Sequence, residues 1–131
     1  MPSSAPASAF NRTRRAYLAT ELSVADTHWA RLRGLMGTAP AAFRAGQGLW
    51  IVPSHGVHTL AMRFPIDVLY LDGNRFVVHL EQNLKPWRVA PIRARATSVL
   101  ELPTETLRST GTVLGDEIEI LMGQGAEVKP A

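Results

Sequence analysis

Residues that could do chemistry are concentrated in one stretch of the sequence, residues 54–73, which reads SHGVHTLAMRFPIDVLYLDG. His58, Thr59, Arg63 and Asp67 lie there among apolar residues that are typical of strands. A polar group placed among residues that favour burial needs a hydrogen-bond partner or a functional task. We therefore expect the functional site in or beside this stretch.

A metal site is one use for these side chains, because imidazole nitrogens and carboxylate oxygens bind zinc and similar ions. The candidate ligands are His55, His58, His79 and Asp67. His55 and His58 are three positions apart, a spacing that sends two side chains to opposite faces of a strand, and only a turn at residues 54–56 would bring them together. We expect no metal and no other cofactor, and we interpret the histidines as hydrogen-bonded groups near the end of a strand.

Acid–base catalysis is a second use, since Asp67 and Glu101 occur on separate predicted strands that could share a cleft. In the structural alternative, Asp67 accepts backbone hydrogen bonds where its strand begins, and Glu101 pairs with Arg63 across the sheet. We favour the structural roles. A nucleophilic triad has less support, because Ser54 beside His55 lacks the Gly-x-Ser-x-Gly pattern.

Ligand binding without catalysis is a third use, and it needs fewer precisely placed residues than catalysis does. A concave β-sheet face with one aromatic and several polar side chains can form a binding site. The candidate ligand-binding residues are His58, Thr59, Arg63, Asp67, Trp87, Arg88 and Glu101. Residues 85–95 contain four basic residues and no acid, which favours an anionic ligand, a sugar-like ligand or a protein surface. A single aromatic residue in that segment makes nucleic-acid binding unlikely.

Composition places the chain among single-domain globular proteins: 131 residues, 46% of them hydrophobic and 19% charged, suffice for one core. The net charge is +3, and Arg12, Arg14 and Arg15 alone supply that excess, which favours a solvated basic terminus. The absence of cysteine excludes disulfides and thiol catalysis. We find neither a secretory signal nor an apolar run long enough for a membrane helix, and we expect a cytoplasmic protein.

Short strands are the elements that must position these side chains. Alternating or continuous apolar runs bounded by Pro, Gly or Ser predict strands over residues 16–24, 49–52, 57–62, 66–71, 75–80, 97–102 and 117–122. The turn Asp72-Gly73-Asn74 predicts an antiparallel hairpin between the fourth and fifth of these strands. Trp50, in the second, is assigned to the core.

One main helix is predicted near the N-terminus. Ala25, Trp29, Leu32 and Met36 recur at helical spacing, and Gly37 can end the helix. Trp29 lies on this apolar stripe, and we therefore assign it to the core. Met36 is likewise interpreted as a packing residue.

The rest of the chain completes a mainly β domain of the α+β class. Residues 38–45 and 104–109 predict short helical turns, residues 1–14 a flexible leader, and residues 124–131 a flexible tail around a domain at 15–123. Few crossover-length helices separate the strands. This argues for a mostly antiparallel sheet folded into a sandwich or a partly closed barrel.

The order of several short motifs resembles the DUF192 family, also called UPF0127. The motifs are Gly34-Leu35-Met36, His58-Thr59 followed by Met62, Pro65-Ile66-Asp67 leading to Leu71-Asp72-Gly73, Val99-Leu100-Glu101-Leu102, and Gly115-Asp116, within about residues 16–121. The resemblance implies one small, mostly β domain, similar to a jelly-roll-like sandwich, in a family found in bacteria and archaea, and we expect this chain to be bacterial. The activity of the family is unassigned, so the resemblance implies no reaction.

Taken together, the residues and the resemblance favour a non-enzymatic module that binds a small molecule or a partner protein. The alternative is a hydrolase-like enzyme that uses Asp67 and His58, with or without a metal. Glu101 is the third candidate catalytic residue in that alternative.

Overall fold

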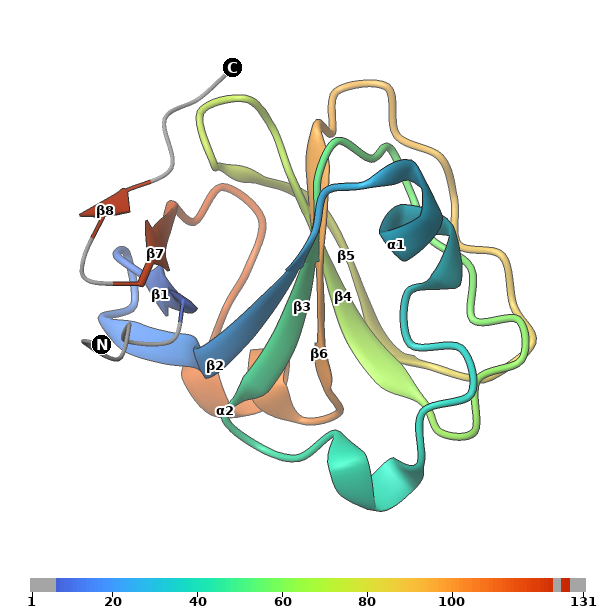
Figure 1. The fold of residues 1–131 in the computed structure, drawn as a ribbon. Coiled ribbons are helices and arrows are strands. Elements are labelled where there is room, and N and C mark those ends of the chain that lie inside the picture. Colours follow the sequence, from blue (N-terminus) through green and yellow to red (C-terminus); the bar gives the residue numbers. More distant parts are fainter. Residues whose placement is uncertain (1–6, 124–125, 128–131) are drawn as a thin grey trace, which may run out of the picture.

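The computed structural model describes residues 7–123 and 126–127. Within them, eight strands form one curled sheet (Figure 1). The strands are β1 (Ala7–Asn11), β2 (Ala16–Ala25), β3 (Gln47–Ile51), β4 (Ile66–Leu71), β5 (Val77–Leu84), β6 (Ser98–Pro103), β7 (Ile118–Met122) and β8 (Ala126–Glu127). Their order across the sheet is β5-β4-β6-β3-β2-β1-β7-β8. Strands β2 and β3 pair in parallel and the other neighbours are antiparallel, so the sheet is mixed.

Most of the predicted strands are confirmed. They correspond to β2 through β7, and the strand predicted at residues 66–71 matches β4 residue for residue. The predicted hairpin also forms, because the Asp72 side chain accepts the backbone N–H groups of Asn74 and Phe76 in the turn, both at 2.9 Å.

Helices in the described residues are short: α1 (His28–Arg33), the 3-10 turn η1 (Pro40–Ala42) and α2 (Thr106–Thr110). The side chain of Thr27 caps α1 by accepting the N–H of Ala30, and the helix ends at Gly34, where φ is 49°. A main N-terminal helix ending at Gly37 is therefore not confirmed. The assignment of Trp29 to the core is wrong, because its side chain is 69% exposed and α1 buries none of its residues.

The sheet curls until its two sides approach each other at one end. Phe76, just before β5, forms a bridge with Glu117, just before β7, and the N–H of Val77 donates to the carbonyl of Asp116 at 2.9 Å. The result is a half-barrel. The prediction of a partly closed barrel is thus confirmed in its coarse form, whereas a jelly-roll-like arrangement is not confirmed, because the described strands belong to one sheet.

Two hydrophobic clusters cover the two faces of the sheet. The inner cluster takes residues from β1 through β7 and from α2, and it includes Trp50, as predicted. The outer cluster lies on the other face of β3, β4 and β6, under the loops at residues 52–65 and 85–97. All six residues of β4 are buried because both of its faces are covered.

Residues 57–62 were predicted to be a strand, and this prediction is wrong. In the structure His58 forms an isolated bridge with Val89, and residues 60–61 make a turn. Thr59 exchanges backbone hydrogen bonds with the 85–88 loop, since its N–H donates to the carbonyl of Arg88 at 2.7 Å. Of the apolar residues in this segment, Met62 is buried, Val57 and Ala61 are half-buried, and Leu60 is exposed.

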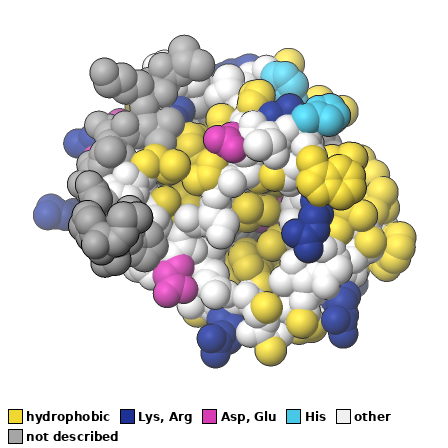
Figure 2. All heavy atoms as spheres, in the orientation of Figure 1, with side chains coloured by type: hydrophobic (Ala, Val, Ile, Leu, Met, Phe, Trp, Pro, Cys, Tyr) yellow, Lys and Arg dark blue, Asp and Glu magenta, His cyan; other side chains and the backbone are white. Residues whose placement is uncertain are grey.

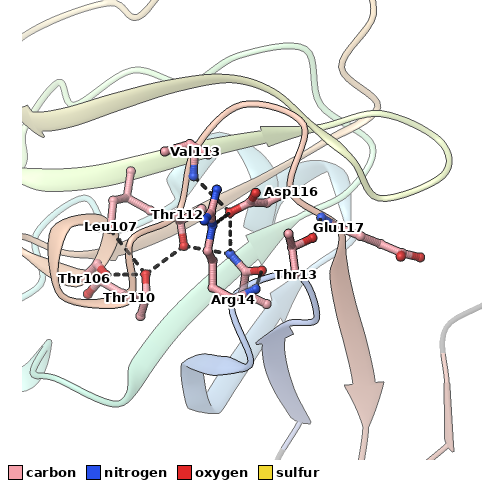
Figure 3. Close-up of polar contacts among 10 residues, drawn as sticks. Thr13, Arg14, Thr106, Leu107, Thr110, Thr112, Val113, Asp116 and Glu117 are labelled. Atoms are coloured by element: carbon pink, nitrogen blue, oxygen red, sulfur yellow. Dashed lines mark hydrogen bonds and ion pairs between the residues drawn. The ribbon is translucent and has the colours of Figure 1, made fainter.

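The predicted flexible leader over residues 1–14 is contradicted from Ala7 onward. Strand β1 lies between β2 and β7, and its residues Ala9 and Asn11 are fully buried. The Asn11 amide donates to the hydroxyl of Thr112 and to Oδ2 of Asp116, and the Arg14 Nε–H donates to the same Asp116 oxygen at 3.0 Å. Figure 3 shows Arg14 reaching Asp116 in this cluster. These bonds fasten the N-terminal segment to the start of β7.

The pKa of Asp116 is consistent with its role in holding the N-terminal segment. Burial alone would raise the pKa of this carboxyl group. Hydrogen bonds from Asn11, Arg14 and the N–H of Val113, together with the charge of Arg14, outweigh burial and hold the pKa below its ordinary value. The ionised form of Asp116 is therefore the form that the fold stabilises.

The remaining terminal predictions fall mostly outside the described residues. This is the case for residues 1–6 and for most of the predicted tail at 124–131. Of the tail, Ala126 and Glu127 are described, and they pair with β7 as β8. None of the helices in the described ranges has the length and hydropathy needed to cross a membrane.

Candidate functional site

A pocket of about 470 Å³ opens on the outer face of the sheet, between α1 and the loops that follow β3 and precede β6. Its apolar lining is Leu32, Ile51, Val57, Val89, Ala90 and Ile92, and its polar side chains are His28, Arg31, Ser54, His55, His58 and Glu101. Figure 2 shows hydrophobic side chains gathered on the side of the molecule that carries α1, with histidines beside them. The pocket thus combines apolar walls with several polar side chains, and small-molecule sites commonly combine the two.

Glu101 is the acid of this pocket. It lies within β6, opposite Leu49 of β3 on one side and Val68 of β4 on the other, and the residue is 1% exposed. Its Oε1 atom is buried and has no hydrogen-bond partner among the described residues. Burial raises the pKa of Glu101 from an ordinary 4.5 to about 8, so the side chain is mostly protonated and uncharged at neutral pH.

The predicted ion pair between Glu101 and Arg63 does not form. Arg63 lies in the bend before β4 and is exposed, and the structure has no ion pair between the two among its described residues. The carboxyl group of Glu101 is therefore buried without an ion-pair partner among the described residues. Polar groups with perturbed pKa values in such surroundings cluster at functional sites.

His58 and His55 both line the pocket but use ring nitrogens to hold the backbone. His58 Nδ1 accepts the N–H of Leu60 at 3.2 Å, so Nε2 carries the proton and donates to the carbonyl of Leu32 at 3.2 Å. His55 Nδ1 donates to the carbonyl of Ala96 at 2.6 Å. His58 thus ties its loop to the end of α1.

The histidines and acids do not converge on a metal position. His79 lies on β5, where its Nε2 contacts a carboxylate oxygen of Glu81 at 2.6 Å. Within residues 7–123, no group of three or more His, Asp or Glu side chains is placed to hold a metal ion. Of the four predicted ligands, His55 and His58 line the pocket, whereas His79 lies on β5 and Asp67 on the inner face of β4.

Asp67 lies on the opposite side of the sheet from Glu101. It shares the inner face of β4 with Leu69 and Leu71, whereas Glu101 lies on the outer face with Val68. Asp67 is 2% exposed. The structure therefore does not bring the two predicted acids into one cleft.

Both carboxylate oxygens of Asp67 are used to hold the backbone. Oδ1 accepts the N–H of Asn83 at 2.9 Å and Oδ2 accepts the N–H of Leu107 at 3.0 Å. Asp67 thereby joins β4 to the end of β5 and to α2. It does not line the pocket that contains His58.

Thr59, Trp87 and Arg88 are brought together, though not around the pocket. The Thr59 hydroxyl donates to the carbonyl of Lys85 at 2.6 Å and accepts the N–H of Arg88 at 2.8 Å. The side chains of Trp87 and Arg88 are exposed. Of the predicted ligand-binding residues, the structure brings His58 and Glu101 to the pocket.

Sequence reasoning missed the apolar rim of the pocket. Leu32 had been placed on a core-facing stripe, and Val89 and Ile92 lie in a loop without regular spacing. In the structure these three side chains are more than half exposed and line the pocket. The available signal was the presence of large aliphatic residues in a proline-containing loop, since such residues are usually buried or used in binding.

Residues 9–120 match the sequence model of the DUF192 family, described as an uncharacterized ACR. The chain belongs to this family. A UPF0127 protein of Thermococcus sibiricus is 31% identical over 114 residues, which cover 83% of this chain and 71% of that protein. A UPF0127 protein of Pyrococcus furiosus is also 31% identical over 114 residues, covering 83% of this chain and 94% of that protein.

The fold of this DUF192 protein is similar to that of a protein of unknown function from Novosphingobium aromaticivorans. Its crystal structure aligns with a TM-score of 0.73 at 18% identity, covering 88% of this chain and 84% of that one. The family resemblance seen in the motifs is confirmed. The archaeal relatives are at odds with the bacterial source that we expected, and the family is one of unknown function.

Proposed function

We propose that the pocket over Glu101 binds a small molecule and that this DUF192 protein is a binding module rather than an enzyme. The observation that carries the proposal is the buried carboxyl group of Glu101, which has no partner and lines an apolar pocket. An unsatisfied buried polar group costs about 1–3 kcal/mol of stability. A ligand that forms a hydrogen bond with Glu101 would remove that cost, which is a physical reason for the group to be there.

The dimensions and the rim of the pocket support the same proposal. A volume of about 470 Å³ lies within the range of roughly 300–1,000 Å³ that is usual for small-molecule sites. Leu32, Val89 and Ile92 are 54%, 71% and 74% exposed at its rim. A ligand with an apolar body would cover these side chains, and burial of apolar area contributes about 25 cal/mol per Å².

The hydrolase-like alternative has less support from the geometry. Asp67 lies on the other face of the sheet and both of its oxygens accept backbone hydrogen bonds. His58 uses both ring nitrogens, and the Ser54 hydroxyl donates to the carbonyl of Gly56 at 2.6 Å. No pair of nucleophile and base among the described pocket residues has the mutual hydrogen bond that covalent catalysis requires.

Titration of the protein with toluene and with benzamide, followed by amide NMR spectra, tests the proposal. We expect chemical-shift changes in α1 and in the loops at residues 52–58 and 89–92, because these segments surround the pocket. Val89→Trp should fill the mouth of the pocket and weaken the binding of both probes. Leu114→Trp is the matched control, since Leu114 is also exposed but does not line the pocket.

The proposal fails if neither probe changes the spectrum of the pocket segments. It also fails if the two tryptophan variants weaken binding equally, because the binding would then not depend on this pocket. Both variants change exposed residues, and we therefore expect both to fold.

A further inference from the structure

We propose that the natural ligand of the pocket is an uncharged molecule with an apolar body and a carbonyl-type oxygen that accepts a hydrogen bond from the Glu101 carboxyl group. This inference rests on the function proposed above and names the chemical class that the site would take.

The charged groups around the pocket disfavour a cationic ligand. Glu101 is the one carboxyl group among the lining residues in the described part of the chain. At the mouth, α1 contributes Arg31, whose guanidinium Nη1 donates to the carbonyl of Asp26 at 3.0 Å. A cationic ligand would pass this guanidinium and would require Glu101 to ionise among apolar side chains, which is unfavourable in a low-dielectric site.

An anionic ligand fits the inner part of the pocket, beside Glu101, no better than a cationic ligand does. It could contact Arg31 at the mouth, but the end of the ligand beside the uncharged Glu101 would place its negative charge among apolar side chains, and burial of a charge without an ion-pair partner is unfavourable. The other titratable groups that line the pocket are His28, His55 and His58. Tyr70 belongs to the outer cluster, where His79 packs against its ring and where Glu81 and Arg93 act on its pKa. The Tyr70 hydroxyl donates to the carbonyl of Pro91 at 2.6 Å, and burial raises its pKa to about 12, so it supplies no charge at neutral pH.

Apolar side chains form the walls of the pocket. Ile51 is buried on β3, and Ala90 is buried in the loop that covers the outer cluster. These residues, with Leu32, Val89 and Ile92 at the rim, make most of the lining apolar. A ligand with one polar group and an apolar remainder matches this distribution, because its polar end meets Glu101 and its body meets the walls.

The protonation state of Glu101 supports the choice of a hydrogen-bond acceptor. With a pKa of about 8, the carboxyl group carries its proton at neutral pH and can donate it to a carbonyl oxygen. When the pH rises above 8, the proton is lost, and a carboxylate offers only acceptors. Affinity for a ligand that accepts this hydrogen bond should then fall, approaching a tenfold loss for each further pH unit.

Four probes of similar shape separate the chemical classes: acetophenone, benzylammonium, benzoate and toluene. Acetophenone has a carbonyl oxygen that accepts a hydrogen bond and no N–H group that could donate to a carboxylate. We expect acetophenone to bind most tightly at pH 6.5 and to bind at least tenfold more weakly at pH 9.5, as measured by NMR titration. Circular dichroism at both pH values checks that the protein remains folded. Toluene, which lacks a hydrogen-bonding group, should show little dependence on pH.

Two substitutions at Glu101 provide the controls. Glu101→Gln keeps an uncharged donor at every pH, so acetophenone should bind within a few fold of its affinity for the parent protein at pH 6.5 and should lose its pH dependence. Glu101→Leu removes the donor, so the affinity for acetophenone should fall to that for toluene. Both variants replace a buried group that lacks a partner, and we expect both to fold.

The inference is overturned if benzylammonium or benzoate binds more tightly than acetophenone, or if acetophenone and toluene bind equally to the parent protein. Such a result leaves the proposed function intact as long as Val89→Trp still blocks the probe that binds. If none of the four probes binds at millimolar concentration, both the inference and the proposed function are overturned.

Discussion

Gly34 and Glu101 lie in contact distance although 67 positions separate them in the sequence: a β-carbon built on Gly34 would be 3.7 Å from Oε1 of Glu101. Gly34 also ends α1 with φ of 49° and ψ of −127°, a backbone conformation that residues with a β-carbon rarely adopt. It lines the Glu101 pocket and a second pocket of about 500 Å³ beside β2 and β3. The glycine of the motif Gly34-Leu35-Met36 therefore lets the end of α1 lie close to the side chain of Glu101.

Gly34→Ala should lower the free energy of unfolding by about 1 kcal/mol or more, because residue 34 has a positive φ. The substitution should also weaken probe binding, because the added methyl group lies against the Glu101 carboxyl group. Gly37→Ala is the control: its φ is 73°, but a β-carbon there has nothing within 4 Å. Urea denaturation should show a comparable cost in both variants. Equal binding of benzamide by both would contradict the role given to Gly34 at the pocket.

Glu101→Gln should change how stability depends on pH. The pKa of Glu101 is raised from 4.5 to about 8 by burial, so between these values the unfolded chain has released a proton that the folded protein retains. Rising pH therefore favours the unfolded state of the parent protein, by up to about 1.4 kcal/mol per pH unit over this window. Chemical denaturation at pH 5, 6.5 and 8 should show Glu101→Gln gaining stability relative to the parent at each step. A constant difference would show that Glu101 is ionised in the folded protein.

Asp67→Asn should lower the free energy of unfolding by about 1–3 kcal/mol, because both carboxylate oxygens of Asp67 accept buried N–H groups and an amide offers only one oxygen. Asp72→Asn is the control, since Asp72 uses a single oxygen, Oδ1, for Asn74 and Phe76 and is more exposed. Thermal melts of the two variants should differ clearly. If Asp67→Asn melts at or above the parent temperature, Asp67 is not a structural anchor.

Deletion of residues 1–14 should lower the melting temperature by many degrees. It removes β1 from between β2 and β7 and takes away the hydrogen bonds that Asn11 and Arg14 make to Asp116. Arg12→Ala tests the basic side chain alone: Arg12 is exposed and its backbone N–H still donates to the carbonyl of Glu117, so stability should be unchanged. A deletion variant that melts like the parent protein would mean that β1 contributes little to the sheet.

Much of the sheet could be predicted from the sequence because its strands are short apolar runs ended by turn residues. β1 could not, because Ala7–Asn11 contains mostly small residues, and its burial depends on β7, more than 100 positions away. Trp29 was misplaced since helical spacing identifies a common face but not whether that face is covered.

The site was predicted only in part for a related reason. Asp67 and Glu101 both interrupt buried strands, and a strand buried on both faces carries no periodicity that tells which face holds a pocket. The hydrogen bonds that satisfy Asp67 come from Asn83 and Leu107, and only the fold brings these together. Glu101 differs from Asp67 in the absence of such donors, which no local pattern reveals.

The most direct test of the binding-site account is the pKa of Glu101 itself. It can be followed through the carboxyl ¹³C chemical shift of the 131-residue chain between pH 4 and pH 10, with Glu101→Gln used to assign the signal. The account predicts a midpoint near 8, because the side chain is buried without a partner in an apolar pocket. A midpoint near 4.5 would contradict it, since Glu101 would then be an ionised and solvated or paired carboxylate at neutral pH.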